Sequence, residues 1–184
     1  MGPAQTFAET AVEQSVDMAK ADGKNQAEVA RVKAAIESII DQIMTATSLD
    51  EIRENITPII NENSDVFPDW FVEIGPDHMS RDWMVWLLNY DPIPALASFD
   101  GPVFSAYGGK DTQVSAKTNA PIMEATLTHA SSEIMIFSEI NHMFQPAKTG
   151  ALEEYVWSDT TFDEPMLAAI GDWLDITVAA RGAQ

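Results

Sequence analysis

The sequence predicts a mixed α/β protein that is helical over residues 1–98 and then changes to a parallel strand–helix–strand unit. Apolar residues recur at helical spacing through most of the first part, which contains no convincing strand. Two short runs rich in β-forming residues, 102–107 and 133–137, follow with room for a helix between them. We therefore expect a helical region over residues 1–98 and an α/β region over residues 99–184.

The first two expected helices show amphipathic patterns with recognisable ends. Residues 7–21 carry apolar side chains at helical spacing, and Asp22-Gly23 follows as a stop signal. Asn25 and Glu28 form a capping box ahead of the second helix. Its apolar stripe continues to Ile43, which predicts a helix of about twenty residues.

Three weaker helical signals follow. Ser48 and Glu51 predict the start of a third helix, in which Pro58 predicts a kink or an early end. Residues 70–72 predict a short helical turn after a polar loop. Ser80 is expected to cap another short helix that is apolar almost all round.

A last helix is expected at the end of the α/β region, over residues 164–180. Asp163 and Glu164 lie at its start and Pro165 in its first turn, where helix N-termini favour acidic residues and proline. Its buried stripe is expected to comprise Leu167, Ile170, Trp173, Leu174 and Val178. Two parallel strands make an unusually small sheet, so the sequence predicts an incomplete sheet or one that other polypeptide completes.

A carboxylate and an imidazole follow the two predicted strands. Asp111 comes directly after the first strand in the loop 108–111, and His142 comes shortly after the second. Consecutive loops of a right-handed parallel unit emerge at the same edge of the sheet, so these two side chains can meet. A carboxylate that holds a histidine provides two of the three members of a nucleophile-activating triad.

The third member, a nucleophile, is not apparent. A doubly wound serine hydrolase carries its serine in a G-x-S-x-G turn, but none of the nine glycines has serine two positions later. Ser105 falls within a predicted strand, and Ser138 precedes His142 too closely to be presented to it. The chain has no cysteine, which removes thiolate nucleophiles, thiolate metal sites and disulfides and leaves the compartment undetermined.

The net charge and the hydropathy of the chain argue against two classes of partner, nucleic acids and membranes. The formal net charge is −19 at pH 7, which repels phosphate backbones, so no nucleic acid partner is expected. No apolar run approaches the roughly 18 residues of a membrane span, so no membrane partner is expected either.

The remaining polar residues favour structural explanations. His129 is expected to end a helix and complement its dipole, and Glu153-Glu154 is expected to be a solvated face. His78 has carboxylates near it, but not at the i, i+4 spacing of a helical metal site. A metal-dependent hydrolase that uses His78, His142 and Asp111 is therefore a weak alternative, and no metal or cofactor is expected.

A connected series of residues runs through roughly the second half of the chain. It comprises 89–92 (NYDP), Pro94, Leu96, 101–104 (GPVF), 107–114 (YGGKDTQV), Asn119, 140–145 (INHMFQ), Thr149-Gly150, Glu154-Tyr155, Pro165, Leu167, Ile170, Trp173 and Leu174. This pattern resembles the C-terminal part of α/β-hydrolase esterases, particularly their dienelactone-hydrolase-like and S9-peptidase-like branch. The resemblance implies an incomplete α/β-hydrolase fold in which a helical lid precedes the last two parallel strands and their helices. Residues 1–4 then resemble the end of the strand before the lid.

The resemblance also implies a function, hydrolysis of small carboxylic esters by a serine hydrolase. Asp111 would be the triad acid and His142 the triad base. The family order of serine, aspartate and histidine places the serine, the first strands and the oxyanion donors upstream of Met1, so this chain alone is expected to be inactive. The lid residues expected to shape an acyl pocket are Phe71, Trp83, Met84 and Trp86.

The alternative is a non-catalytic partner subunit. In that case the exposed edge of the small sheet would pair with another chain or with a second copy of this one.

Overall fold

The computed structural model describes residues 3–182 and divides them into two compact units. The helical unit comprises residues 6–91, and the α/β unit comprises residues 92–182 together with residues 3–5. The described chain is of mixed α/β class and mostly helical, with one two-stranded parallel sheet. The boundary between the units lies at 91/92, whereas the sequence pattern predicted it at 98/99.

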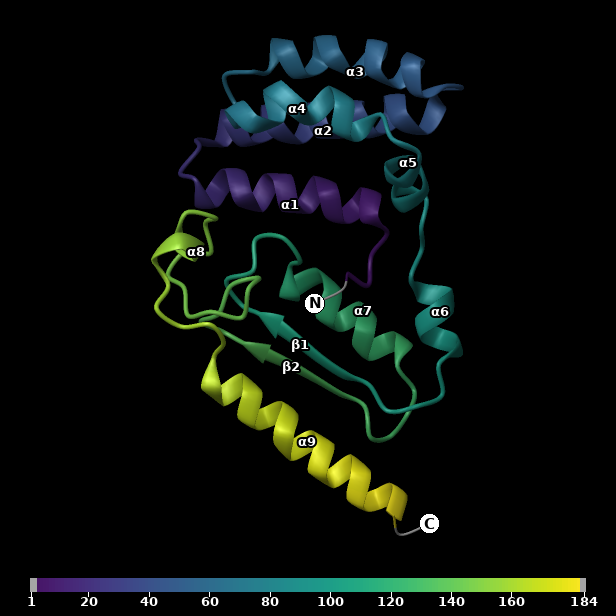
Figure 1. Ribbon diagram of the computed structural model, residues 1–184, viewed down its shortest axis with the longest axis vertical. Coiled ribbons are helices and arrows are strands. Elements are labelled where there is room, and N and C mark those ends of the chain that lie inside the picture. The colour runs from purple at the N-terminus through teal and green to yellow at the C-terminus, as the bar shows by residue number, and fades with distance from the viewer. Residues whose placement is uncertain (1–2, 183–184) are drawn as a thin grey trace. The chain divides into compact units, whose positions relative to one another are not determined.

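The helical unit contains α1 (Phe7–Ala21), α2 (Gln26–Thr45), α3 (Leu49–Glu62), α4 (Asp69–Met79) and α5 (Asp82–Leu88). Each of the first four helices packs against the next one along the chain, and α5 packs against α1, α2 and α4 (Figure 1). The structure confirms the predicted positions of α1 and α2.

The first two helices begin at reciprocal capping boxes. The Asn25 side chain accepts hydrogen bonds from the backbone N–H of Ala27 and of Glu28, and the Glu28 carboxylate accepts one from the Asn25 N–H. Thr6 and Glu9 form the same arrangement at α1, although the sequence pattern did not predict that cap. Each such cap satisfies amide groups that helical hydrogen bonding leaves free and contributes about 1 kcal/mol.

The apolar faces of these helices meet in one continuous core. Ile39, Ile56 and Ile60 are completely buried there because the 3.6-residue repeat places them on inward faces of α2 and α3. The buried members of this core are Ala19, Val32, Ala35, Ile36, Ile39, Ile43, Ile52, Ile56, Ile60, Val66, Phe67, Met84 and Leu88. The helical unit therefore buries its apolar stripes within itself.

Pro58 was expected to kink α3 or to end it early, and it does not end the helix early. The helix continues to Glu62 because Ile52, Ile56 and Ile60 align on one buried face, and this burial outweighs the hydrogen bond that proline removes. At its start the Ser48 side chain accepts from the Glu51 N–H as expected.

Two further helix expectations near α4 and α5 are corrected. The expected turn at 70–72 belongs to α4, an 11-residue helix that continues through Pro76. Ser80 does not cap α5: the residue at that position is Arg81, and the Ser80 hydroxyl donates back to the Pro76 carbonyl at 2.7 Å. A serine hydroxyl that bonds to the preceding turn ends one helix rather than beginning the next.

The centre of the α/β unit is the strand–helix–strand arrangement that the sequence predicted. Strand β1 (Phe104–Gly108) and strand β2 (Glu133–Phe137) pair in parallel, and α7 (Ala116–Thr126) connects them. The register places Phe104 opposite Glu133 and Gly108 opposite Phe137, so both strands end at the same edge. His129 lies beyond the end of α7, which corrects its expected place in a helix, and its Nδ1 accepts from the Ser131 N–H.

Three other helices complete this unit: α6 (Ile93–Ser98), α8 (Glu154–Trp157) and α9 (Glu164–Gly182). Helix α7 packs on one side of the sheet and α9 on the other, which gives this unit three layers (Figure 1). Neither α6 nor α8 was predicted, since each is too short to show a periodic pattern.

The segment 3–5 is fastened to α7 by a single buried side chain. Asn119 Oδ1 accepts from the Ala4 N–H at 2.7 Å and from the Gln5 N–H at 3.2 Å, and Asn119 is completely buried. Residues 1–4 were expected to end a strand. Of these, residues 1–2 lie outside the described residues, and Pro3 and Ala4 are not in a strand.

Helix α9 buries only part of the stripe that the sequence predicted. Leu167, Leu174 and Val178 are exposed, at 49%, 47% and 65%. The buried positions are Met166 and Thr177, with Trp173 half-buried between them. Of the predicted stripe, Ile170 and Trp173 are therefore half-buried, whereas Leu167, Leu174 and Val178 are uncovered among the described residues.

Candidate functional site

The loop after β1 folds around the carboxylate of Asp111. Its Oδ1 accepts hydrogen bonds from the Gln113 N–H at 2.7 Å and the Val114 N–H at 2.9 Å. Aspartate commonly makes such bonds to the backbone that follows it, and they close the turn that leads into α7. The Asp111 side chain is completely buried, with Oδ2 left for another partner.

The loop after β2 is a tight turn that carries His142. Its two limbs pair through Ala147 N–H to the Glu139 carbonyl and Asn141 N–H to the Gln145 carbonyl, both at 2.9 Å. Asn141 is buried, and its Oδ1 accepts from the N–H groups of Met143 and Gln145. These bonds fix the backbone on both sides of the histidine.

Phe144 adds a strained backbone conformation to this turn. Its φ of 57° lies in the left-handed region, which costs an ordinary residue about 1 kcal/mol. The conformation is held because the Phe144 N–H donates to the Asn141 carbonyl, and the Phe144 carbonyl accepts from the Asp163 N–H at 2.8 Å. The Phe144 ring also stacks with that of Phe162. Non-glycine residues held in this region cluster at functional sites.

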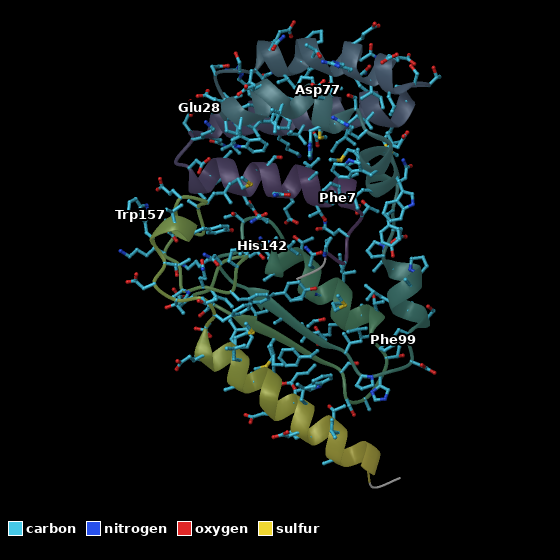
Figure 2. The ribbon with its side chains drawn as sticks, in the orientation of Figure 1. Phe7, Glu28, Asp77, Phe99, His142 and Trp157 are labelled. Carbon is cyan, nitrogen blue, oxygen red and sulfur yellow. The ribbon has the colours of Figure 1, made fainter. Side chains whose placement is uncertain are left out.

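The two loops bring Asp111 and His142 together. His142 Nδ1 lies 3.1 Å from Asp111 Oδ2, and the imidazole is 27% exposed while the carboxylate is fully covered. Figure 2 shows His142 at the end of the sheet where both strands finish. Within residues 3–182, ring Nε2 has no hydrogen-bond partner. An Nδ1–H that donates to Asp111 leaves Nε2 as a free proton acceptor.

Glycines allow this close approach. A Cβ on Gly108 would collide with the backbone of Ile140, and one on Gly109 would collide with the backbone of Ser138. The adjacent Lys110 N–H donates to the Ile140 carbonyl at 3.0 Å. This bond joins the loop after β1, which carries Asp111 and is called the acid loop below, to the loop after β2, which carries His142. Larger residues at 108 or 109 would separate the two loops.

Glu154 is a site residue that the sequence reading missed, because it was expected on a solvated face. Its carboxylate accepts from the N–H groups of Lys148, Thr149 and Gly150 and from the Thr149 hydroxyl. Burial acts to raise the pKa of Glu154, but the hydrogen bonds from Thr149 and the backbone outweigh it and hold the pKa below its ordinary value. No regular pattern in the sequence indicates these contacts, because they depend on the path of an irregular loop.

The loop that Glu154 closes lies against the acid loop. The Gly150 carbonyl accepts from the Thr112 hydroxyl at 3.1 Å, and Gly150 has a φ of +82°. A Cβ there would overlap the Lys110 carbonyl. Tyr155, next to Glu154, accepts a hydrogen bond from the Gln113 side chain at 2.9 Å.

Tyr107, in β1, is a buried titratable group near this site. Its hydroxyl has no hydrogen-bond partner among the described residues, and burial raises the pKa of Tyr107 to about 12. The phenol therefore stays protonated at neutral pH and does not serve as a base.

The four residues expected to shape an acyl pocket all lie in the helical unit. Met84 is 5% exposed within its core, and Phe71 packs against that core, so both side chains have a structural role. Trp83 is half exposed and contacts the ring of His78 edge-on, and Trp86 is 63% exposed. The two tryptophans are the most exposed of the four residues, and the pocket stays a prediction.

The serines considered as nucleophiles make no contact with the histidine. Ser105 is buried within β1, and Ser138 contributes a backbone carbonyl against Gly109. Within the described residues, no group of three or more His, Asp or Glu side chains is arranged to hold a metal ion. No helix in that part of the chain is both long and apolar enough to cross a membrane.

Comparisons with protein-family models, with curated proteins and with solved structures found no match for this chain.

Proposed function

We propose that this chain carries the acid and the base of a serine hydrolase that acts on carboxylic esters, as part of an α/β-hydrolase fold. In this proposal Asp111 and His142 are the second and third members of the triad. The nucleophile and the oxyanion donors come from polypeptide outside the described residues, so the 184-residue chain alone is inactive.

The observation that carries the proposal is the asymmetry of the Asp111–His142 pair. The carboxylate is completely buried, and its Oδ1 is held by two backbone N–H groups. Its Oδ2 faces His142 Nδ1 at 3.1 Å, while the opposite ring nitrogen is unpartnered within residues 3–182. A buried carboxylate behind a partly exposed imidazole is the arrangement that activates a hydroxyl nucleophile.

The geometry supports a simple division of roles. His142 Nε2 takes the proton of a serine hydroxyl as that oxygen attacks the ester carbonyl, and it returns the proton to the leaving alcohol. Asp111 keeps the proton of the neutral ring on Nδ1 and stabilises the imidazolium that forms. Because the carboxylate is fixed by backbone donors, it does not need to reorganise during proton transfer.

The hydrogen-bond direction in the pair can be tested without measuring hydrolysis. Nitrogen NMR of the folded chain, at a pH where the ring is neutral, should show His142 mainly as the Nδ1–H tautomer. Asp111→Asn keeps an oxygen for the Gln113 and Val114 N–H groups but turns an amide N–H toward the ring, so the Nε2–H tautomer should dominate. An unchanged tautomer in this variant would contradict the acid–base assignment.

The missing nucleophile has its own test. A fluorophosphonate probe should leave no stoichiometric serine adduct on the purified chain, because no serine contacts His142 within the described residues. A stoichiometric adduct would contradict that part of the proposal. In an assembled enzyme that supplies the serine, Asp111→Asn should lower kcat by about 10⁴.

The exposed stripe on α9 favours a second candidate, a non-catalytic subunit whose sheet another chain completes. Leu167, Leu174 and Val178 are exposed beside a sheet of only two strands. In this case the chain should associate in sedimentation and bind a dye that detects exposed apolar surface. A monomer that binds no such dye would count against this candidate.

A further inference from the structure

The side chain of Tyr155, in the short helix α8, contacts the acid loop through Gln113. Gln113 makes two contacts that connect them: its backbone N–H donates to Asp111 Oδ1 at 2.7 Å, and its side-chain Nε2 donates to the Tyr155 hydroxyl at 2.9 Å. Gln113 therefore links the buried carboxylate to a residue 42 positions further along the chain.

Hydrogen bonds to the preceding loop hold helix α8, and with it Tyr155, in position. The neighbouring Glu154 accepts hydrogen bonds from three consecutive backbone N–H groups, those of residues 148–150. The carbonyl of Gly150 in turn accepts from the Thr112 hydroxyl, which lies between Asp111 and Gln113. Helix α8 thus supports two consecutive positions of the acid loop: Tyr155 bonds directly to Gln113, and Glu154 holds the loop 148–150 whose Gly150 carbonyl bonds to Thr112.

The hydroxyl of Tyr155 is also electrostatically close to the acid. Burial raises the pKa of Tyr155, the hydrogen bond from Gln113 lowers it, and the negative charge of Asp111 raises it again, for a net increase. A neutral phenol accepts the amide hydrogen bond and adds no second negative charge beside the carboxylate. It therefore orients the loop without competing with Asp111 for the proton of the imidazole.

We propose that Tyr155, acting through Gln113, is a positioning residue that keeps Asp111 Oδ2 directed at His142 Nδ1. Its consequence for catalysis rests on the proposed function, but its effect on the imidazole does not. When the hydrogen bond between the Gln113 side chain and the Tyr155 hydroxyl is removed, the turn at 111–114 is held less firmly. The Asp111 carboxylate then samples orientations in which Oδ2 no longer faces the imidazole.

The test compares Tyr155→Phe, Gln113→Leu and the double variant in the full chain. The readout is the ratio of Nδ1–H to Nε2–H tautomer of His142 by nitrogen NMR. Each single variant should lower this ratio on the order of 5-fold, as expected for the loss of one neutral hydrogen bond. The double variant should lower it no further, because both changes remove the same contact.

The matched control is Tyr90→Phe, which removes a hydroxyl from an exposed tyrosine stacked on Trp86 in the helical unit. It should leave the His142 tautomer unchanged. If Tyr155→Phe fails to fold, Gln113→Leu alone decides the question, since it removes the other half of the contact.

The outcomes separate this inference from the proposed function. If Asp111→Asn shifts the tautomer while Tyr155→Phe and Gln113→Leu do not, the positioning role is wrong and the acid–base pair stands. If Asp111→Asn has no effect, the proposed function itself fails. An additive effect in the double variant, or an equal effect of Tyr90→Phe, would also overturn the positioning role.

Discussion

The two units of this chain reach order by different means. The helical unit buries a single large apolar cluster that includes three completely buried isoleucines, Ile39, Ile56 and Ile60. The α/β unit has a much smaller central cluster, Tyr107, Val114, Ala116 and Ala120, and much of its order lies in hydrogen-bonded loops. The helical unit is held together mainly by a large apolar core. The α/β unit has a small core, and hydrogen bonds fix the conformation of its loops.

Exposed apolar side chains occur in both units. On α9 alone, Leu167, Leu174, Ile176 and Val178 are all exposed, and Ile136 is 55% exposed in β2. The helical unit also exposes large apolar side chains, among them Trp70, Trp83 and Trp86. The two units therefore differ in the size of their buried cores and not in whether they expose apolar side chains.

The largest difference between the two units is expected from a pair of isoleucine truncations. Ile56→Ala, in the core of the helical unit, should cost about 2–5 kcal/mol of stability, because it removes buried methyl groups and leaves a cavity. Ile176→Ala, 71% exposed on α9, should change stability by less than about 0.5 kcal/mol. Urea denaturation followed by amide NMR signals measures both. A comparable loss for Ile176→Ala would mean that something covers this face of α9 in solution.

A pair of glycine substitutions tests the crowding of the loops. Gly23 and Gly150 both have positive φ, at +78° and +82°. Gly23, after α1, has open space where a Cβ would lie, so Gly23→Ala should cost about 1 kcal/mol for backbone strain alone. Gly150→Ala would also overlap the Lys110 carbonyl and should cost roughly 2 kcal/mol or more.

Thermal unfolding measures the loss of stability in Gly23→Ala and in Gly150→Ala. The NMR signal of His142 should move only in the Gly150 variant. Equal losses at Gly23 and Gly150 would show that the loop around Asp111 yields easily and that its crowding does not position the acid.

A smaller effect on the stability of the α/β unit is expected when the pH is lowered. The folded pKa of Glu154 lies below its ordinary value of about 4.5, so its carboxylate stabilises the fold fully above that pH. This contribution is lost as the pH falls through the lowered, folded pKa. Glu154→Gln should therefore flatten the fall in stability of the α/β unit between neutral and acidic pH.

Glu153→Gln is the matched control, because the Glu153 side chain makes no hydrogen bond within the described residues. Denaturation midpoints over a pH series compare the two variants. If both variants flatten the profile equally, the hydrogen bonds of Glu154 are not its cause.

The parts of the fold that sequence reasoning could predict are those with regular patterns or strong local rules. Helices α1 and α2, the capping box at Asn25 and the strand β2 follow from periodicity and residue type. The meeting of Asp111 and His142 follows from the parallel direction of the two strands, which places the loops after both strands at the same edge of the sheet. The catalytic role of the pair stays a proposal.

Other features could not be predicted because no local rule specifies them. Helix α9 is apolar on two adjacent stripes, so periodicity alone cannot say whether Met166 or Leu167 and Leu174 are buried. The contacts of Glu154 depend on where an irregular loop places three backbone N–H groups. Helix α4 continues past Gly75 and Pro76 because of packing, which outweighs intrinsic propensity.

The short span between the two site residues has a consequence for how the protein folds. Asp111 and His142 are 31 positions apart, and the strands that present them are joined through one helix. The loop that must close is therefore short, and its entropic cost grows only slowly with length. Contacts of low sequence separation form early in folding, so the pair can assemble as soon as this one supersecondary unit forms.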